Sequence, residues 1–390
     1  MAKQSASEGG RPRRGIVITL IALASVVGFL AIFSVWIARE ILETDTWAEN
    51  STELLEDDDI REPVSGFLAD EIFTGVDVEA ELEQSLPPQA QALAGPAAGG
   101  LRQLAEEAAD RALQRPRVQQ LWEEANAAAH GRFVQVVEGE GDNVSTEGGV
   151  VTLDLGGLVE QIASQVGIDV SDKIPPDAGQ VEILGSGELS LVQDIFNALK
   201  PLAILLTLAT LALFALAVYL ARGWRREALR AVGFAFVLIG LLVLVVRGVA
   251  GDFLPGSLAS TASGEAMVSS VWEIYTSLLK ASAWSVIGYG VIIVLGAWLA
   301  GPGETARSIR RELAGVLRGR NVAYALLATI LLLVFWWNPT PGTTRLLSSL
   351  LLVGLTVAGV EALRHQAIKD FPEETLETAS ARWRERFRRT

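Results

Sequence analysis

Six apolar stretches without charged interiors divide this chain of 390 residues, and they constrain its fold more than any other feature. Each is about 17–22 residues long, the length at which a helix crosses roughly 30 Å of hydrocarbon. The sequence therefore predicts a mainly α, multi-pass integral membrane protein. The expected transmembrane helices lie at residues 16–37 and at about 202–221, 229–247, 282–300, 321–337 and 345–361.

The first apolar stretch, residues 16–37, follows a polar segment, residues 1–15, that carries four basic residues. A basic start before an apolar run is typical of a signal sequence. The run is longer than the roughly 7–15 residues of a cleaved signal peptide, and it leads directly into Arg39 and Glu40. We therefore expect an uncleaved signal-anchor helix. Cleavage is the alternative, and it would leave five transmembrane helices with the same later topology.

Acidic residues concentrate in residues 38–200, between the first two apolar stretches. This segment holds 33 of the 46 acidic residues but only 9 of the 32 basic ones, a net charge of −24 against −14 for the whole chain. The remainder is therefore net positive. Such an asymmetry is typical of a chain whose charge is sorted by a bilayer.

Basic residues mark the loops that we expect in the cytoplasm. Arginines cluster after the second, fourth and sixth apolar stretches, whereas the other loops are acidic or uncharged. The positive-inside rule then places both termini in the cytoplasm. We expect a bacterial plasma membrane protein with an extracytoplasmic domain (residues 38–200), a five-helix membrane domain (201–362) and a cytoplasmic, basic-ended helical tail (363–390).

The outer segment is predicted to be an α+β domain inserted between transmembrane helices one and two. Its first part has a helical pattern, and the later part contains short alternating, β-branched runs that are typical of strands. The expected elements are helices at Leu101–Leu113, about 116–137 and 158–166, strands at 149–154 and 181–184, and a helix that starts near Leu189 and runs into the second transmembrane helix.

Several classes of activity lack their usual residues. The chain has no cysteine, which excludes disulfides, thiolate metal sites and cysteine nucleophiles. The two histidines, His130 and His365, are expected on opposite sides of the membrane, so they cannot form a zinc site within one chain. Phosphate-binding, serine hydrolase and metalloprotease motifs are missing. The sequence predicts no cofactor and no metal. It leans against an enzyme but leaves the question open, because so many carboxylates always include pairs, and a pair of carboxylates can act as general acid and base.

Trp122, Asn126 and His130 recur every four residues and therefore share one face of a helix. A histidine beside an amide is a candidate for binding a polar ligand or a proton. A lone histidine on a packed helix face is more often a hydrogen-bonded core residue, and we favour this second interpretation.

A second candidate site lies near the outer end of the third apolar stretch. Gly233, Gly240 and Arg247 recur at seven residues, and small residues allow helices to approach closely in lipid. Asp252 and Glu265 are the candidate partners of Arg247. Extension of Arg247 to the lipid headgroups is the alternative.

A third candidate is the string at residues 336–345, which contains Trp337 and Asn338 and then a turn with two prolines and a glycine. A helix is expected to end at Asn338, because the residue before a proline disfavours the helical conformation. A rigid hairpin between two membrane helices explains the string, and a binding role for Trp337 and Asn338 is the sharper hypothesis.

Residues 301–320 predict an amphipathic helix at the membrane surface. Ala306, Ile309 and Leu313 share one face, and arginines occupy the other. We therefore expect anionic lipid near Arg307, Arg310 and Arg311, and also near the arginine-rich C-terminus. No sequence feature indicates binding to nucleic acid.

The pattern as a whole resembles a group of integral membrane proteins of GC-rich Gram-positive bacteria. The resemblance rests on residues 121–126 with His130, on the Val-Val-Thr-Leu-Asp run at 150–154, and on residues 337–341. That group has no assigned activity. The resemblance therefore implies the membrane architecture and adds no catalytic or binding residue.

Two functions fit these observations. The leading hypothesis is a non-enzymatic envelope protein, either a scaffold or a signalling protein. Its outer domain would bind a protein or cell-wall partner, and its helices would anchor that domain in the bilayer or transmit the state of that domain through the membrane. The alternative is a transporter or lipid-handling protein, which requires a cavity among the membrane helices.

Overall fold

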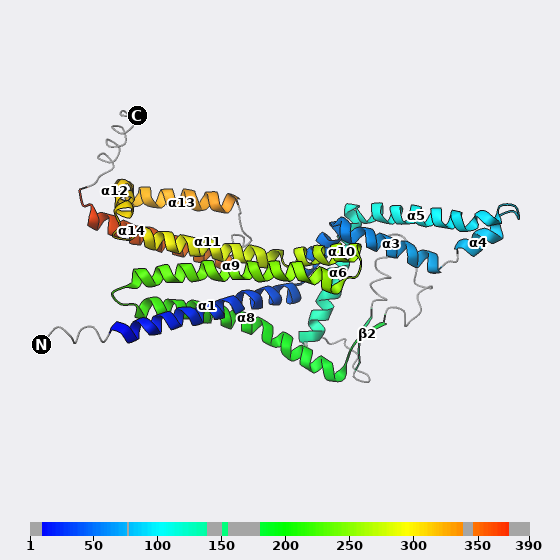
Figure 1. Cartoon of the computed structure of the whole chain (residues 1–390), viewed down its shortest axis with the longest axis horizontal. Helices are drawn as coiled ribbons and strands as arrows, with labels where there is room; N and C mark the ends of the chain where they lie inside the picture. The colour runs from blue at the N-terminus through cyan, green and yellow to red at the C-terminus, as the bar shows by residue number, and fades with distance from the viewer. Residues whose placement is uncertain (1–9, 76–77, 139–149, 155–179, 338–345, 374–390) are drawn as a thin grey trace, which may run out of the picture. The chain divides into compact units, whose positions relative to one another are not determined.

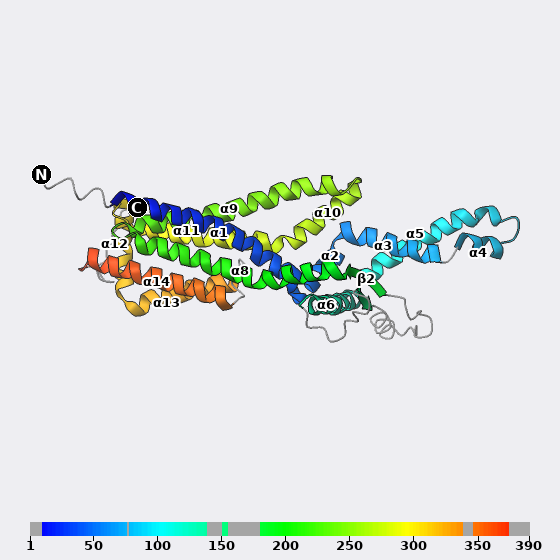
Figure 2. The same ribbon diagram turned by 90° about the horizontal axis from the view of Figure 1, so that it is seen from below.

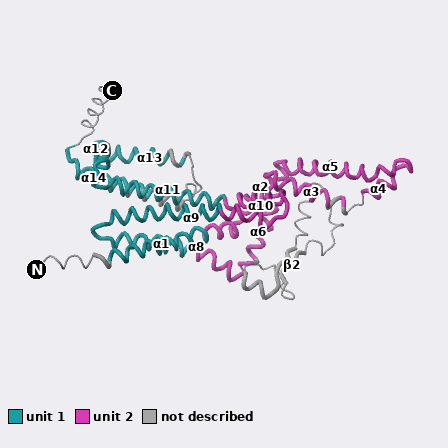
Figure 3. Tube along the Cα trace, viewed as in Figure 1, with its two compact units in different colours: residues 1–34, 203–248, 277–390 teal, residues 35–202, 249–276 magenta. Residues whose placement is uncertain are grey.

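The computed structural model describes residues 10–75, 78–138, 150–154, 180–337 and 346–373, and most of them are helical. The chain divides into two compact units, drawn in different colours in Figure 3. One unit, here called the apolar unit, comprises residues 1–34, 203–248 and 277–390. The other, here called the acidic unit, comprises residues 35–202 and 249–276.

Among the described residues, four helices are long and apolar enough to cross a membrane. This finding supports the prediction of a multi-pass membrane protein, since each exceeds the roughly 20 residues that a bilayer requires. They are α1 (Gly10–Leu42), α8 (Ser186–Leu220), α9 (Arg225–Leu258) and α11 (Ser277–Leu299), whose candidate spans are Arg13–Leu42, Gln193–Leu220, Arg225–Leu258 and Ser277–Leu299.

The prediction of exactly six spans is not supported by the described residues. Helices do form at both remaining places, as α13 (Arg320–Trp337) and α14 (Leu346–Asp370). The described apolar part of α13, Arg320–Leu332, is shorter than a full span, and α14 is not among the four candidates. Helix α14 extends past its apolar part into the charged residues Glu361, Arg364 and Lys369.

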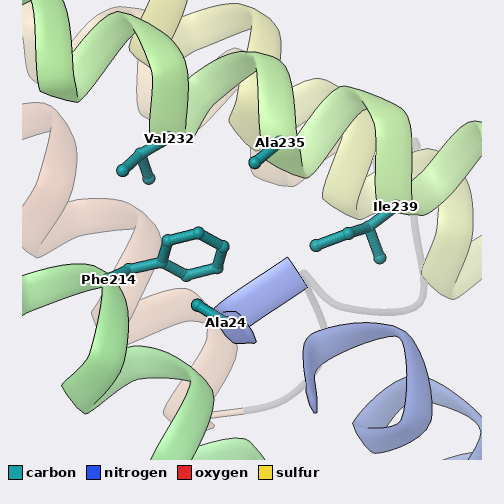
Figure 4. Close-up of a cluster of buried hydrophobic side chains, with 5 residues drawn as sticks. All are labelled: Ala24, Phe214, Val232, Ala235 and Ile239. Carbon is teal, nitrogen blue, oxygen red and sulfur yellow. The ribbon is translucent and has the colours of Figure 1, made fainter. Parts of the chain in front are cut away.

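The core of the apolar unit forms where α1, α8 and α9 run side by side (Figures 1 and 2). Phe214 of α8 packs against Val232, Ala235 and Ile239 of α9 and against Ala24 of α1 (Figure 4). A large ring at Phe214 requires small neighbours, and the two alanines provide the space. The interdigitation of one large and several smaller side chains fills this region without charged groups.

Helices α9 and α11 approach each other at glycines. A Cβ atom on Gly233 would lie 2.9 Å from the carbonyl oxygen of Gly290, and one on Gly240 would lie 2.7 Å from that of Ala283. Contacts this short exclude any side chain. The predicted close packing at Gly233 and Gly240 is therefore present, with α11 as the partner helix.

The predicted amphipathic helix is present as α12 (Glu304–Arg318), but its buried face differs from the expected one. Ala306, Arg310, Ala314 and Leu317 are buried, whereas Ile309 is exposed. Ala314 and Leu317 pack with Ala367 of α14 in one small cluster.

Arg310, near which anionic lipid was expected, is directed into the protein. Its side chain is only 1% exposed. It donates hydrogen bonds to the backbone carbonyls of Leu299 and Gly301, where α11 ends, and pairs with the Asp370 carboxylate at 2.8 Å. The carbonyls at a helix C-terminus attract a cation, and this attraction explains why the arginine is drawn inward. Arg307 remains exposed.

In the described residues, the acidic unit is almost entirely helical. Helices α3 and α5 lie side by side in both views of the chain (Figures 1 and 2), and we call this pair the arm. The helices of this unit are α2 (Thr44–Glu56), α3 (Asp58–Gly75), α4 (Val78–Ser85), the short 3-10 helix η1 (Gln91–Leu93), α5 (Ala94–Leu113), α6 (Pro116–Glu138) and α10 (Ala262–Tyr275).

Ion pairs between α3 and α5 hold the arm together. Arg61 contacts Asp110 at 2.8 Å, and Arg102 contacts Asp70 at 2.6 Å. Helix α5 ends at Leu113, as the sequence predicts, and Pro116 is the first residue of α6. A proline is well tolerated there because the first turn of a helix needs no backbone N–H donor.

Two short strands, β1 (Val150–Asp154) and β2 (Gln180–Gly185), pair in antiparallel fashion with a shift between Val151 and Thr152. These strands pair only with each other among the described residues, and the rest of the described acidic unit is helical. The described residues therefore do not support an α+β domain, because two strands make no sheet layer for helices to cover. The helix expected at residues 158–166 lies outside the described residues.

Two boundaries of the acidic unit can be compared with the domain limits expected from the sequence. Helix α8 is unbroken from Ser186 to Leu220, so the helix expected from Leu189 does continue into the second apolar stretch. Its first part packs on α6, where Phe196 meets Phe133 with ring centroids 5.9 Å apart. The unit also includes residues 249–276, which the sequence analysis assigned to the membrane domain.

Candidate functional site

The predicted stripe on α6 faces α2. The Trp122 indole N–H donates to the carbonyl oxygen of Ser51 at 2.9 Å. Asn126 donates its side-chain amide to the carbonyl oxygen of Trp122, one turn earlier on the same helix. Trp122 therefore links α6 to α2, and Asn126 satisfies a backbone carbonyl of its own helix.

His130 is buried at the point where α1 ends and α2 begins. Its side chain is 6% exposed, and its ring stacks on Trp47 with centroids 4.8 Å apart. The ring nitrogen Nε2 lies 3.1 Å from the carbonyl oxygen of Ile41, and Nδ1 lies 3.1 Å from the Thr44 hydroxyl. Both ring nitrogens are thus satisfied by protein groups.

The hydrogen bonds of His130 assign its tautomer. A carbonyl oxygen can only accept, so Nε2 carries the proton, and Nδ1 then accepts from the Thr44 hydroxyl. Burial lowers the pKa of His130 below its usual value near 6.5, although the bond to Ile41 opposes this effect. The ring is therefore neutral at neutral pH. These contacts favour a core histidine over a ligand-binding one.

A second buried polar group is the carboxyl group of Glu40 in α1, next in sequence to Ile41. The Glu40 side chain is 5% exposed. The side-chain amide of Asn50, itself buried in α2, donates to Glu40 Oε2 at 2.5 Å. A buried carboxyl group with an amide partner is unusual, because a charged group normally requires a cation or water.

Aromatic residues surround this carboxyl group. Trp36, one helical turn earlier, lies within hydrogen-bonding reach of it and donates its indole N–H to the backbone carbonyl of Tyr275 in α10 at 2.9 Å. The Tyr275 ring packs edge-on against Trp47, with centroids 5.9 Å apart. The end of α1 is thus enclosed by α2, α6 and α10. Chemically, this arrangement can hold a proton on Glu40 and exclude water from it.

The arm presents a different kind of surface. Ala97, Leu101, Leu104 and Ala108 recur along α5 at spacings of four, three and four residues, and all four are exposed. This spacing places them on one face of the helix. Phe67 on α3 is also exposed. The arm therefore combines apolar side chains with the acidic residues of the same helices.

The remaining predicted residues are not brought into this site. Arg247 and Asp252 both lie on α9, with Arg247 half-buried and Asp252 exposed. Trp337 is the last residue of α13, and Asn338 lies outside the described residues.

Sequence reasoning missed Glu40, Asn50 and Tyr275. Glu40 was used only to mark the end of the first apolar stretch. The signal present in the sequence was a carboxylate one helical turn after Trp36, three residues beyond the end of that stretch. Tyr275 lies 239 residues after Trp36, and no local pattern connects positions so far apart.

Comparison of the chain with protein-family models, with curated proteins and with solved structures finds no match. The function must therefore be argued from the chain itself.

Proposed function

We propose that this protein is a non-enzymatic envelope protein that binds a protein or cell-wall partner through its acidic unit. The observation that supports the proposal best is the exposed apolar face on α5, formed by Ala97, Leu101, Leu104 and Ala108. Apolar residues that recur on one exposed helix face are typical of surfaces that pack against a partner.

The proposal also specifies the number of membrane spans and their orientation. Helices α13 and α14 complete a set of six spans, both termini lie in the cytoplasm, and the acidic unit faces the outside of a bacterial plasma membrane. The distribution of charge supports this orientation, because arginines follow α8 and α11 whereas the acidic residues gather in 38–200. An α+β arrangement of the later outer segment and the resemblance to membrane proteins of GC-rich Gram-positive bacteria belong to the same proposal.

The membrane helices are proposed to anchor the acidic unit and to transmit its conformational state through the membrane. Helix α1 runs without a break from the apolar stretch into the buried Glu40, and α8 runs without a break from Ser186 to Leu220. Exposed arginines such as Arg307 and the arginine-rich C-terminus are proposed to contact anionic lipid headgroups.

The transporter or lipid-handling alternative requires a cavity between membrane helices. The contact of α9 with α11 gives it no support, because their backbones meet at Gly233, Gly240 and Gly290 with no room for a methyl group. We therefore rank it second.

Photo-crosslinking in living cells tests the partner. A photoreactive amino acid replaces Leu104 in the full-length protein, and the same amino acid at the exposed Gln103 serves as the control on another face of α5. We expect a discrete adduct from position 104 that is absent from position 103. The adduct should disappear when Leu101 is also changed to Glu, because a charge on the apolar face disfavours its burial.

Two results would overturn the proposal. One is the same set of adducts from both positions, and the other is an adduct at position 104 that survives Leu101→Glu. A lipid adduct at position 104 would instead favour the alternative function.

A further inference from the structure

The Glu40 carboxyl group is enclosed, and among the residues that the structure describes no cation lies beside it. It is 5% exposed, and its hydrogen-bonding neighbours are the Asn50 amide and the Trp36 indole. Arg39, the adjacent basic residue, points toward Glu43 instead, with its Nε atom 3.8 Å from the Glu43 carboxylate. Glu43 itself adds a negative charge near Glu40.

The helices packed around Glu40 bring no compensating charge. Helices α2 and α10 contain no lysine or arginine at all. Their acidic residues are all exposed, and these are Asp45, Glu49, Glu53, Glu56, Glu265 and Glu273. Helix α10 also contributes Tyr275. On α6, His130 is neutral for the reasons given above, and Arg132 is exposed. An ionised Glu40 would therefore be a buried charge among other negative charges, which is strongly unfavourable.

We propose that Glu40 is a proton-binding site whose neutral form holds α2 and α10 against the end of α1. In this form the carboxyl group accepts from the Asn50 amide at 2.5 Å and leaves no net charge in the enclosure. Loss of the proton to water creates a buried carboxylate that Asn50 and Trp36 alone do not compensate. The favourable response is for water to reach it, which requires α2 or α10 to move away.

The proposal makes the acidic unit responsive to pH in one direction. Packing on α1 is tight at lower pH, where Glu40 keeps its proton, and loosens as pH rises. His130 acts in the opposite direction, and only below its usual pKa near 6.5, because protonation there disfavours its buried state. Loosening caused by Glu40 therefore occurs as pH rises, whereas destabilisation caused by His130 occurs only below about pH 6.5. The inference is independent of the proposed partner, because it concerns only contacts within the chain.

Cysteine labelling in the full-length protein, reconstituted in lipid nanodiscs, tests the proposal. The chain has no native cysteine, so each variant carries a single thiol. Ala48→Cys places it on the buried face of α2, and Glu49→Cys places it on the exposed face. The ratio of the two maleimide labelling rates cancels the pH dependence of the thiol itself. We measure this ratio from pH 6.5 to pH 9.

The expected result is a ratio that rises with pH, by up to about tenfold per pH unit, the most that one proton can give. Glu40→Gln should make the ratio low and constant, because the amide mimics the neutral carboxyl group. Glu43→Gln removes an exposed carboxylate of the same stretch and is the matched control, so the ratio in this variant should still rise.

A constant ratio in the parent protein would overturn the proposal, and so would a rise that persists in Glu40→Gln. If Glu40→Gln fails to fold, infrared spectroscopy of the parent protein decides. The proposal requires the band of a protonated carboxyl group at pH 6.5 that disappears, in step with the labelling ratio, as pH rises. Absence of that band contradicts it.

Discussion

Buried polar side chains in this protein find partners far away in the sequence. Arg310 reaches Asp370, Arg61 reaches Asp110, and His130 reaches Ile41 and Thr44. The sequence analysis identified His130 as a core histidine from its place on a helix face, but it placed Arg310 at the lipid surface. Helical periodicity shows which side chains share a face. It does not show which face another element will cover, and the partner decides whether an arginine turns inward.

The first prediction concerns His130 and pH. Its pKa in the folded protein lies below that in the unfolded chain, so the unfolded state binds more protons and is favoured by acid. The contribution of His130 to stability is complete above about pH 6.5 and falls below it, by at most about 1.4 kcal/mol per pH unit. Thermal unfolding between pH 7.5 and pH 5 measures this effect. His130→Gln should reduce the slope, and His365→Gln, at an exposed position, should leave it unchanged.

The second prediction concerns Arg310. Arg310→Met removes the ion pair with Asp370 and two hydrogen bonds to the end of α11. Because Asp370 is partly exposed, water can recover part of the loss, and we expect the free energy of unfolding to fall by about 2 kcal/mol. Thermal unfolding of the purified protein checks this value. Arg307→Met, on the exposed face of the same helix, is the control, and an equal loss there would refute the role of Arg310.

At the scale of elements, the sequence predicted most helices but not their partners. The end of α5 at Leu113, the start of α6 and the continuity of α8 follow from Pro116, from helix-forming composition and from an uninterrupted apolar pattern, whereas α5 begins at Ala94 and not at the expected Leu101. Helix α10 was not predicted, because residues 262–275 are short and moderately apolar. The β1–β2 pair occurs where alternation predicted strands, yet a pair of strands alone does not make the expected α+β domain.

The contact between α9 and α11 gives the third prediction. Gly240→Val places side-chain atoms where a Cβ would already lie 2.6 Å from Ile287 and 2.7 Å from the Ala283 carbonyl oxygen. Overpacking of this kind costs about 1–3 kcal/mol. Gly248→Val introduces the same side chain on the same helix at a site with nothing within 4 Å. Thermal unfolding should show a clear loss for the first variant and almost none for the second.

At the scale of the whole molecule, the segregation of charge is the property that the sequence predicts most directly. The segment 38–200 holds 33 acidic residues, whereas the remainder of the chain is net positive, and four helices in the described part of the chain are long and apolar enough to cross a bilayer. The number of spans was harder to predict, because the last two apolar stretches are short. The inclusion of residues 249–276 in the acidic unit was also not predictable, since it depends on contacts between segments distant in the sequence.

Orientation in the membrane is the claim on which the account depends most, and single-cysteine labelling of intact cells measures it. The cysteine-free chain receives one thiol at Glu107 on α5 or at Arg307 on α12, both exposed. The proposed topology predicts that a membrane-impermeant maleimide labels position 107 in intact cells and position 307 only after the cells are broken. Labelling of position 307 in intact cells, with position 107 protected until lysis, would contradict it.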